Sequence, residues 1–170
     1  MNILVLNGSP RSNGNTAAFV AAFKEGAESK GHVVDVVRVG GMKINGCLGC
    51  ETCHGMGEGK CIQMDDMQLL YPKLARADMV VIASPVHYWS FSGQIQSCIT
   101  RWYAPGKPAA KSYALILSSG SEGVYDAPIA QYKAILDYFG AVDRGIRTFA
   151  GEDQKTEANL AEIRAFGASM

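Results

Sequence analysis

The sequence of 170 residues has no excess of either charge and no long run of apolar residues. The 16 basic side chains balance 16 acidic ones, so neither a nucleic acid nor a membrane surface is expected as the main partner. No apolar run approaches the roughly 20 residues that a membrane-spanning helix needs. The first residues lack the basic lead and the apolar core of a signal peptide. These absences lead us to expect a cytoplasmic protein.

Internal repeats, low-complexity segments and an interdomain linker are also absent. Hydrophobic residues make up 48% of the chain and charged residues 19%, a composition typical of a globular protein with one sizeable core. Because 170 residues fit one ordinary domain, we expect a single domain over residues 1–170, with a cysteine-rich loop at about 40–64.

Short apolar runs alternate with segments of helical periodicity along the chain. Strands are predicted over 3–6, 33–39, 79–83, 113–117 and 142–149, and helices over about 16–30, 65–77, 93–103, 128–139 and 160–166. This alternation predicts an α/β fold, a three-layer sandwich in which helices cover both faces of a five-stranded parallel sheet. In the flavodoxin-like arrangement the strands take the order 2-1-3-4-5.

The first predicted strand ends in a polar loop that leads directly into a helix. The loop reads Gly8-Ser9-Pro10-Arg11-Ser12-Asn13-Gly14-Asn15-Thr16. Free backbone N–H groups and the helix dipole favour an anion at such a place. The loop is neither a G-x-G-x-x-G fingerprint nor a P-loop, because no Lys follows Gly14. We therefore expect a monophosphate, bound by Ser9, Arg11, Asn13, Asn15 and Thr16; a plain turn with a helix cap is the alternative.

A second unusual loop follows the third predicted strand and carries four ring-bearing residues within five positions, 87–91. Flat rings suit a flat ligand, although they could also fill the core or an oligomer interface. In a flavodoxin-type sheet, ligands bind where the strand order reverses between strands 1 and 3, so the two loops are expected to meet. Together they predict FMN, its ring lined by Pro85, Val86, His87, Tyr88 and Trp89, with Ser119, Gly120 and Tyr125 of the next loop opposite.

Both loops also carry a family resemblance that covers nearly the whole chain in order. Residues Asn7-Gly8-Ser9-Pro10-Arg11 with Gly14-Asn15-Thr16 resemble the signature of the NADPH-dependent FMN reductase and iron–sulfur flavoprotein group. The run Ser84-Pro85-Val86-His87-Tyr88-Trp89 is similar to that group's second flavin loop. The resemblance implies FMN as cofactor, NAD(P)H or a reduced protein as electron donor, and a homodimer or homotetramer. In the family the flavin often lies near a subunit interface.

Four of the five cysteines lie close together, with the spacing C-x2-C-x2-C-x7-C, at Cys47, Cys50, Cys53 and Cys61. Four thiolates can hold a [4Fe–4S] cluster. Zinc could take the four cysteines, or three of them with His54, and free redox-active thiols are a third possibility. Iron–sulfur flavoproteins, which the chain resembles, have a compact four-cysteine motif after the second strand, but their last gap is typically shorter than the seven residues here.

No Ser-His-Asp arrangement is present, and the first loop lacks the cysteine nucleophile of small phosphatases that share this sheet order. Asp65 and Asp66 are interpreted as helix caps rather than as a catalytic pair. We therefore expect an FMN-dependent oxidoreductase in which the flavin passes hydride or electrons to a small acceptor and no side chain is required as acid or base. The alternatives are a non-enzymatic electron carrier and a redox or metal sensor.

Overall fold

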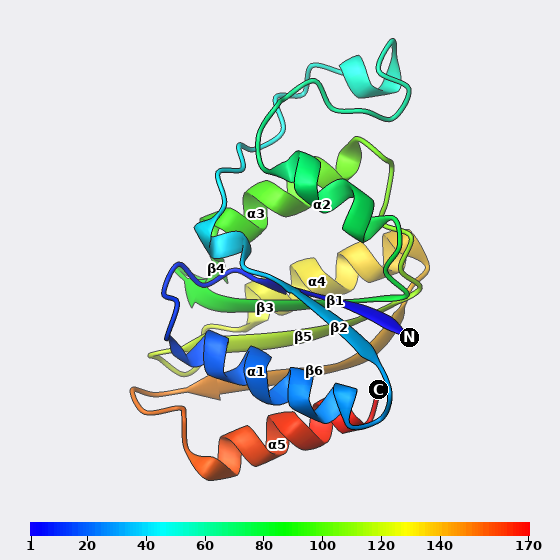
Figure 1. Ribbon diagram of the computed structural model, residues 1–170. Helices are drawn as coiled ribbons and strands as arrows, with labels where there is room; N and C mark the ends of the chain where they lie inside the picture. Colours follow the sequence, from blue (N-terminus) through cyan, green and yellow to red (C-terminus); the bar gives the residue numbers. More distant parts are fainter.

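A twisted sheet of parallel strands runs through the middle of the protein, which is described over residues 1–170 by a computed structural model (Figure 1). Its five long strands lie in the order β2-β1-β3-β5-β6. Their bounds are β1 (Asn2–Asn7), β2 (Val33–Val37), β3 (Met79–His87), β5 (Ser112–Ser119) and β6 (Val142–Ala150). The predicted order 2-1-3-4-5 is confirmed for the parallel strands. Only the numbering changes, because the two-residue antiparallel strand β4 (Ser90–Phe91), which the sequence did not predict, pairs with β3.

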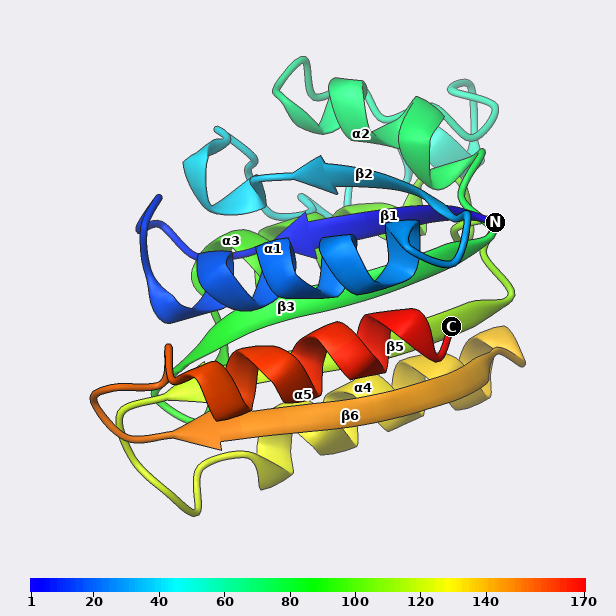
Figure 2. The same cartoon turned by 60° about the horizontal axis from the view of Figure 1, so that its bottom comes forward.

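Helices cover both faces of this sheet, as Figure 2 shows. One face carries α1 (Asn15–Glu28) and α5 (Glu157–Ala168), and the other carries α2 (Met67–Leu74), α3 (Gly93–Thr100) and α4 (Asp126–Phe139). Alternate side chains of β1 enter two separate cores because the side-chain period of a strand is two. Ile3 and Val5 pack on the side of α1 and α5, whereas Leu4 and Leu6 pack on the side of α2 to α4. None of the helices has both the length and the apolar character that crossing a membrane requires.

Strand β3 continues past the Ser84-Pro85 break at which the sequence predicted its end. It pairs with β1 only as far as Ala83, but its pairing with β5 continues to Pro85. Proline lacks an N–H donor and is therefore confined to strand edges. Pro85 can be accommodated because β1 has already ended beside it. The extension carries the chain as far as His87 at the carboxyl edge of the sheet.

Helices α1 and α5 approach each other closely at two glycines. A Cβ atom on Gly26 would overlap the backbone of Arg164, and one on Gly167 would overlap the backbone of Phe23. The two helices are therefore in contact through their backbones, which holds α1 and α5 tightly together.

Between β2 and α2 the chain leaves the sandwich and forms the projection at the top of Figure 1. The 3-10 turn η1 (Val39–Gly41) still packs on the sandwich, with Val39 in the core, and the projection beyond it has one short 3-10 turn, η2 (Thr52–His54). We call residues 46–62 of this projection the cysteine loop.

A buried ion pair lies at the base of the cysteine loop. Arg101 begins the 3-10 turn η3 (Arg101–Tyr103) that ends α3, and its side chain is 1% exposed. Its Nη1 donates to Asp65 Oδ2 at 2.7 Å. Asp65 Oδ1 also accepts from the N–H of Met67, the first residue of α2, so Asp65 combines helix capping with a charge pair. Asp66 is the N-cap residue by position, but its side chain makes no cap bond, contrary to expectation. Burial alone would raise the pKa of Asp65, but hydrogen bonds from Arg101 and from two backbone N–H groups lower it overall.

Gly26→Ala should lower the free energy of unfolding by about 2 kcal/mol, because the added methyl group overlaps the α5 backbone. This loss should exceed the gain of about 1 kcal/mol that alanine brings to a helix. Urea denaturation measures the change. Gly93→Ala is the matched control, because no atom lies within 4 Å of its added Cβ. Equal stability of the two variants would contradict backbone contact between α1 and α5.

The lowered pKa of Asp65 predicts a stability that depends on pH. The ion pair contributes fully above the unfolded pKa of about 3.9, and its contribution is lost as pH falls through the lower folded pKa. Asp65→Asn should therefore flatten the loss of stability in acid and cost about 3 kcal/mol at pH 7. Denaturation from pH 2 to 8 measures both effects. Asp35→Asn, which removes the exposed pair with Lys73, should cost less than about 1 kcal/mol.

Candidate functional site

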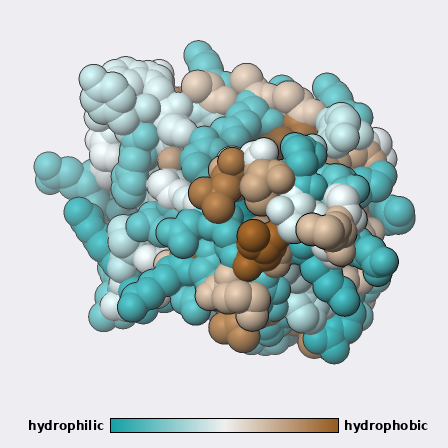
Figure 3. Space-filling view, turned by 90° about the horizontal axis from the view of Figure 1, so that it is seen from above, coloured by the Kyte–Doolittle hydropathy of each residue, from teal (hydrophilic) through white to brown (hydrophobic).

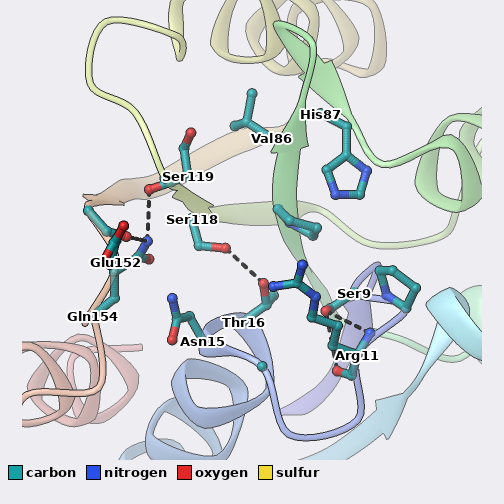
Figure 4. A pocket seen from close by; sticks show the side chains of 15 residues that line it. Ser9, Arg11, Asn15, Thr16, Val86, His87, Ser118, Ser119, Glu152 and Gln154 are labelled. Atoms are coloured by element: carbon teal, nitrogen blue, oxygen red, sulfur yellow. Dashed lines mark hydrogen bonds between the residues drawn. The ribbon is translucent and has the colours of Figure 1, made fainter.

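A cavity of about 480 Å³ lies at the carboxyl ends of β1, β3 and β5, where the sheet order reverses (Figure 4). Four segments contribute its walls: the loop after β1, the end of β3, the end of β5 and the loop after β6. The two loops singled out from the sequence therefore meet at one cavity. The cavity is lined by Ser9, Pro10, Arg11, Gly14, Asn15, Thr16, Pro85, Val86, His87, Ser118, Ser119, Gly120, Gly151, Glu152 and Gln154.

The loop after β1 is folded by short-range hydrogen bonds. Asn7 Oδ1 accepts from Ser9 N at 3.0 Å, and Ser9 Oγ accepts from Arg11 N at 3.2 Å. A Cβ on Gly8 would overlap the side chain of Ile95, so the turn can approach α3 only because this residue is glycine. These contacts direct the chain across the cavity and into α1.

The N-terminus of α1 is open at this cavity. Its N-cap residue is Gly14, which has no side chain to accept from the first N–H groups, and the first turn contains no acidic residue. Such free N–H groups at the positive end of a helix bind anions. Arg11 forms no ion pair with any carboxylate of the chain, and its side chain lies across the cavity in Figure 4. Thr16 Oγ1 lies 2.8 Å from Ser118 Oγ and ties α1 to β5.

Asn13 was predicted to contact the phosphate, but it lies outside the lining of this cavity. It borders an adjoining hollow on the other side of the loop, together with Lys155. There Lys155 Nζ donates to the Asn13 carbonyl at 2.6 Å. Lys155 therefore fastens the tip of the loop to the segment that precedes α5.

The end of β3 lines the cavity with Pro85, Val86 and His87. Tyr88 and Trp89 lie outside the lining, although the sequence predicted them at the ring. They are the two turn residues of the β3–β4 hairpin, with φ angles of 52° and 58°. Bulky residues rarely adopt this left-handed conformation, which costs roughly 1–2 kcal/mol per residue. Their side chains are 94% and 54% exposed, with the rings edge to face at 5.6 Å.

The hairpin rests on a polar network below it. Gln96 Nε2 donates to Ser90 Oγ at 2.8 Å, and Gln96 and Gln131 exchange two amide hydrogen bonds of 2.8 Å. Ser84 Oγ accepts from Ser92 N at 2.9 Å. Helices α3 and α4 therefore hold the aromatic turn in place from the side opposite to solvent.

The fourth wall, after β6, was not predicted from the sequence. Gln154 is 2% exposed, and its Nε2 donates to the carbonyls of Ser119 and Gly151. Its Oε1 is buried and has no hydrogen-bond partner. The signal available in the sequence was a polar loop at the end of the strand beside Ser118. Tyr125, in contrast, lies outside the lining and donates to the Phe149 carbonyl at 2.7 Å.

The four clustered cysteines line a second, much smaller cavity. Cys47, Cys50, Cys53 and Cys61 all face a space of about 20 Å³, which is room for about one water molecule. No three ligand-type side chains of the protein are close enough together to hold one metal ion. In a [4Fe–4S] cluster each cysteine binds a different iron, so its thiols stand further apart than the ligands of a single ion. The donor set suits a cluster, but the space between the thiols would have to widen to hold one.

His54 takes no part in this small cavity. Its ring packs on Tyr103 with centroids 4.3 Å apart, and its Nε2 donates to the Tyr103 carbonyl at 2.8 Å. The Tyr103 hydroxyl in turn donates to the Glu51 carboxylate. His54 is therefore engaged in attaching the cysteine loop to η3, which gives no support to the zinc site of three cysteines and this histidine.

The fifth cysteine, Cys98, is a core residue of α3. It is fully buried against the sheet, and burial raises the pKa of its thiol to about 12. A thiol with so high a pKa is a poor nucleophile and a poor metal ligand at neutral pH. Cys98 therefore contributes packing and no chemistry to either cavity.

Comparison with known proteins finds related chains among flavoproteins. An iron–sulfur flavoprotein of Archaeoglobus fulgidus is 36% identical over 112 residues, which make up 65% of this chain and 50% of that protein. One of Methanocaldococcus jannaschii is 38% identical over 101 residues, 59% of this chain and 50% of that protein. The chain thus spans about half the length of the curated relatives it matches.

Solved structures share the fold at low sequence identity. The NAD(P)H:quinone oxidoreductase from Methanothermobacter marburgensis has a TM-score of 0.73 and 18% identity, covering 99% of this chain and 94% of that one. An FMN-dependent NADH-azoreductase from Bacillus anthracis, solved with FMN, also gives 0.73 at 13% identity, with coverages of 99% and 98%. A sequence model described as NADPH-dependent FMN reductase matches residues 1–155, which include both loops and the whole sheet. The chain therefore belongs to the NADPH-dependent FMN reductase family.

Proposed function

We propose that the protein binds FMN in the larger cavity and passes electrons from NAD(P)H through it to a small acceptor. The observation that carries the proposal is the form of this one cavity, which has an open helix N-terminus at one end and the extended β3 segment at the other. FMN has matching parts, since it carries a single phosphate joined by a sugar-alcohol chain to a flat ring. Membership of the FMN reductase family favours the same cofactor.

The phosphate end is suited to a dianion. The N–H groups of α1 are uncapped, Arg11 is free of carboxylate partners, and no acidic residue stands in the first helical turn. Charge-assisted hydrogen bonds to phosphate are about twice as strong as neutral ones. Arg11 and the helix end would therefore supply most of the affinity for this group.

The wall after β6 is closed by Gln154. Its side chain is buried, and its Nε2 donates to the carbonyls of Ser119 and Gly151. These bonds join the end of β5 to the loop after β6 beside the cavity. Gln154 would thus hold this wall in shape for the flavin, while Val86 and Pro85 shield the flavin from water on the β3 side.

Bound FMN would itself supply the hydride and electron chemistry. The chain's own residues bind it, orient it and exclude water, and no side chain of the site is assigned as an acid or base. Tyr88 and Trp89 directly follow the lining residue His87 in the sequence. Their exposed rings favour a homo-oligomer in which they are covered.

A second role, transfer of single electrons, is favoured by the cysteine loop. Four thiols facing one space are the donor set of a [4Fe–4S] cluster, and the curated relatives are named iron–sulfur flavoproteins. We propose that Cys47, Cys50, Cys53 and Cys61 hold such a cluster. A redox or metal sensor would use the same four residues without turnover of NAD(P)H.

Arg11→Ala should weaken FMN binding by about 10- to 100-fold, because a charge-assisted contact worth roughly 1.5–3 kcal/mol is lost. Titration of the apoprotein with FMN, followed by quenching of flavin fluorescence, measures the dissociation constant. Arg164→Ala is the control, because it removes a pair with Glu25 near the other end of α1 and should leave binding unchanged. The same dissociation constant in both variants would remove Arg11 from the phosphate site.

Anaerobically purified protein should show flavin absorbance that bleaches on addition of NAD(P)H. It should also contain iron and acid-labile sulfide, because the four thiols are the ligands of the proposed [4Fe–4S] cluster. Absorbance spectra and chemical analysis of iron, sulfide and FMN test the two cofactors separately. A colourless protein that rejects FMN would defeat the flavin proposal, and near-zero iron after reconstitution would defeat the cluster.

A further inference from the structure

Arg101 is the one charged residue that is almost completely buried, and it lies where the cysteine loop begins and ends. Its Nη1 donates to the Asn45 carbonyl at 3.0 Å, immediately before the loop. Its Nη2 donates to the Gln63 carbonyl at 3.4 Å, immediately after the loop. A single planar side chain thus joins the entry and the exit of a projection that the rest of the fold does not cover (Figure 1).

Other contacts hold the same base closed. Gln63 Nε2 donates to the Gly46 carbonyl at 3.1 Å, and Gln68 Nε2 from α2 donates to the carbonyls of Cys61 and Gln63. Asp65 Oδ2 binds both Arg101 and the N–H of Asn45. Arg101 occupies the centre of this arrangement, because it alone reaches both ends and the buried carboxylate.

Arg101 also lines the small cavity that the four thiols face. Its Nε is buried and has no hydrogen-bond partner, although the other two nitrogens are engaged. The Asp65 carboxylate partly balances the positive charge of Arg101. The other carboxylate at this cavity, that of Glu51, accepts a hydrogen bond from the Tyr103 hydroxyl. Arg101 therefore borders the cysteine site, and its guanidinium holds the base of the loop.

The tip of the loop differs from its base. Cys50 is exposed, and Gly49 and Gly59 have φ angles of 64° and 84° that favour glycine. No other atom lies within 4 Å of a Cβ built on Gly49, so the tip has room to move. Widening of the space between the thiols can therefore occur in the tip while the base remains closed.

We propose that Arg101 is the positioning residue of the four-cysteine site, closing the base of the loop so that only its tip rearranges when a metal cluster is taken up. Closing a flexible loop costs conformational entropy, and a base that is already closed removes this cost from metal binding. Lysine cannot replace the arginine, because a single ammonium group does not span both ends. The inference rests on the proposed cysteine site and is independent of the flavin.

The first test uses Arg101→Ala with ferrous iron and sulfide as the probe, added anaerobically to the full chain. Residues that support metal ligands typically change metal affinity 10- to 100-fold, so the variant should lose iron to a chelator at least about tenfold faster. Low concentrations of free guanidinium should restore iron retention by filling the space left by the side chain. FMN content should stay at the wild-type level, and Arg164→Ala should behave as wild type.

The second test needs no metal. In reduced, metal-free protein the buried Cys53 should react with iodoacetamide more slowly than the exposed Cys47, and Arg101→Ala should abolish the difference. Arg101→Lys should do the same, and it serves as the milder variant if Arg101→Ala does not fold. Peptide mass spectrometry after timed alkylation gives both rates.

The outcomes separate the two proposals. If wild type takes up no iron but Cys53 becomes exposed in both arginine variants, the cluster is wrong and the closure by Arg101 stands. If the variants hold iron as firmly as wild type, or if Cys53 stays protected in them, Arg101 does not position the site and the proposal is overturned.

Discussion

Burial of both faces of the parallel sheet is the constraint on which the rest of the structure depends. Apolar side chains leave β1 alternately toward two cores, so each core must be covered by its own helices. The connection after β1 therefore enters a helix on one face, and the connection after β3 enters a helix on the other. These two connections leave the same edge of the sheet toward opposite faces, and the cavity with the open N-terminus of α1 lies between them. The binding site follows from how the sheet is covered.

The local features of this design could be predicted from the sequence. The five strands followed from apolar runs and intervening helical periods, and their order followed from the flavodoxin-like arrangement. The place of the loop after β1 at the cavity followed from the same arrangement. The predicted end of β3 was wrong because a proline breaks a strand only where a neighbouring strand needs its missing N–H, and β1 has already ended beside Pro85. Strand β4 was missed because two residues carry no periodicity and depend on the tight turn before them.

Contacts between distant segments could not be predicted. Gln154 reaches the cavity only because β6 lies beside β5, and its local sequence indicates no more than a polar loop at the end of a strand. Asp65 was interpreted as a helix cap, which its bond to Met67 supports, but its buried partner lies 36 positions further along. For Tyr88 and Trp89, composition indicated a flat ligand, whereas backbone geometry sets both rings outward in the single chain. A local sequence pattern indicates which kind of side chain is available, but only the folded backbone determines where that side chain points.

The backbone contact between α1 and α5 has a consequence for how this site can change. Helix α1 is held against α5 at Gly26 and Gly167, so the whole helix, including its open N-terminus at the cavity, has little freedom to shift. The other walls are formed by the ends of β3 and β5 and by the loop after β6, whose side chains can be exchanged without moving the core. One half of the cavity is therefore fixed, and the other half can vary. Under the proposed function, such a division would let the acceptor side change while the contact with the cofactor phosphate is kept.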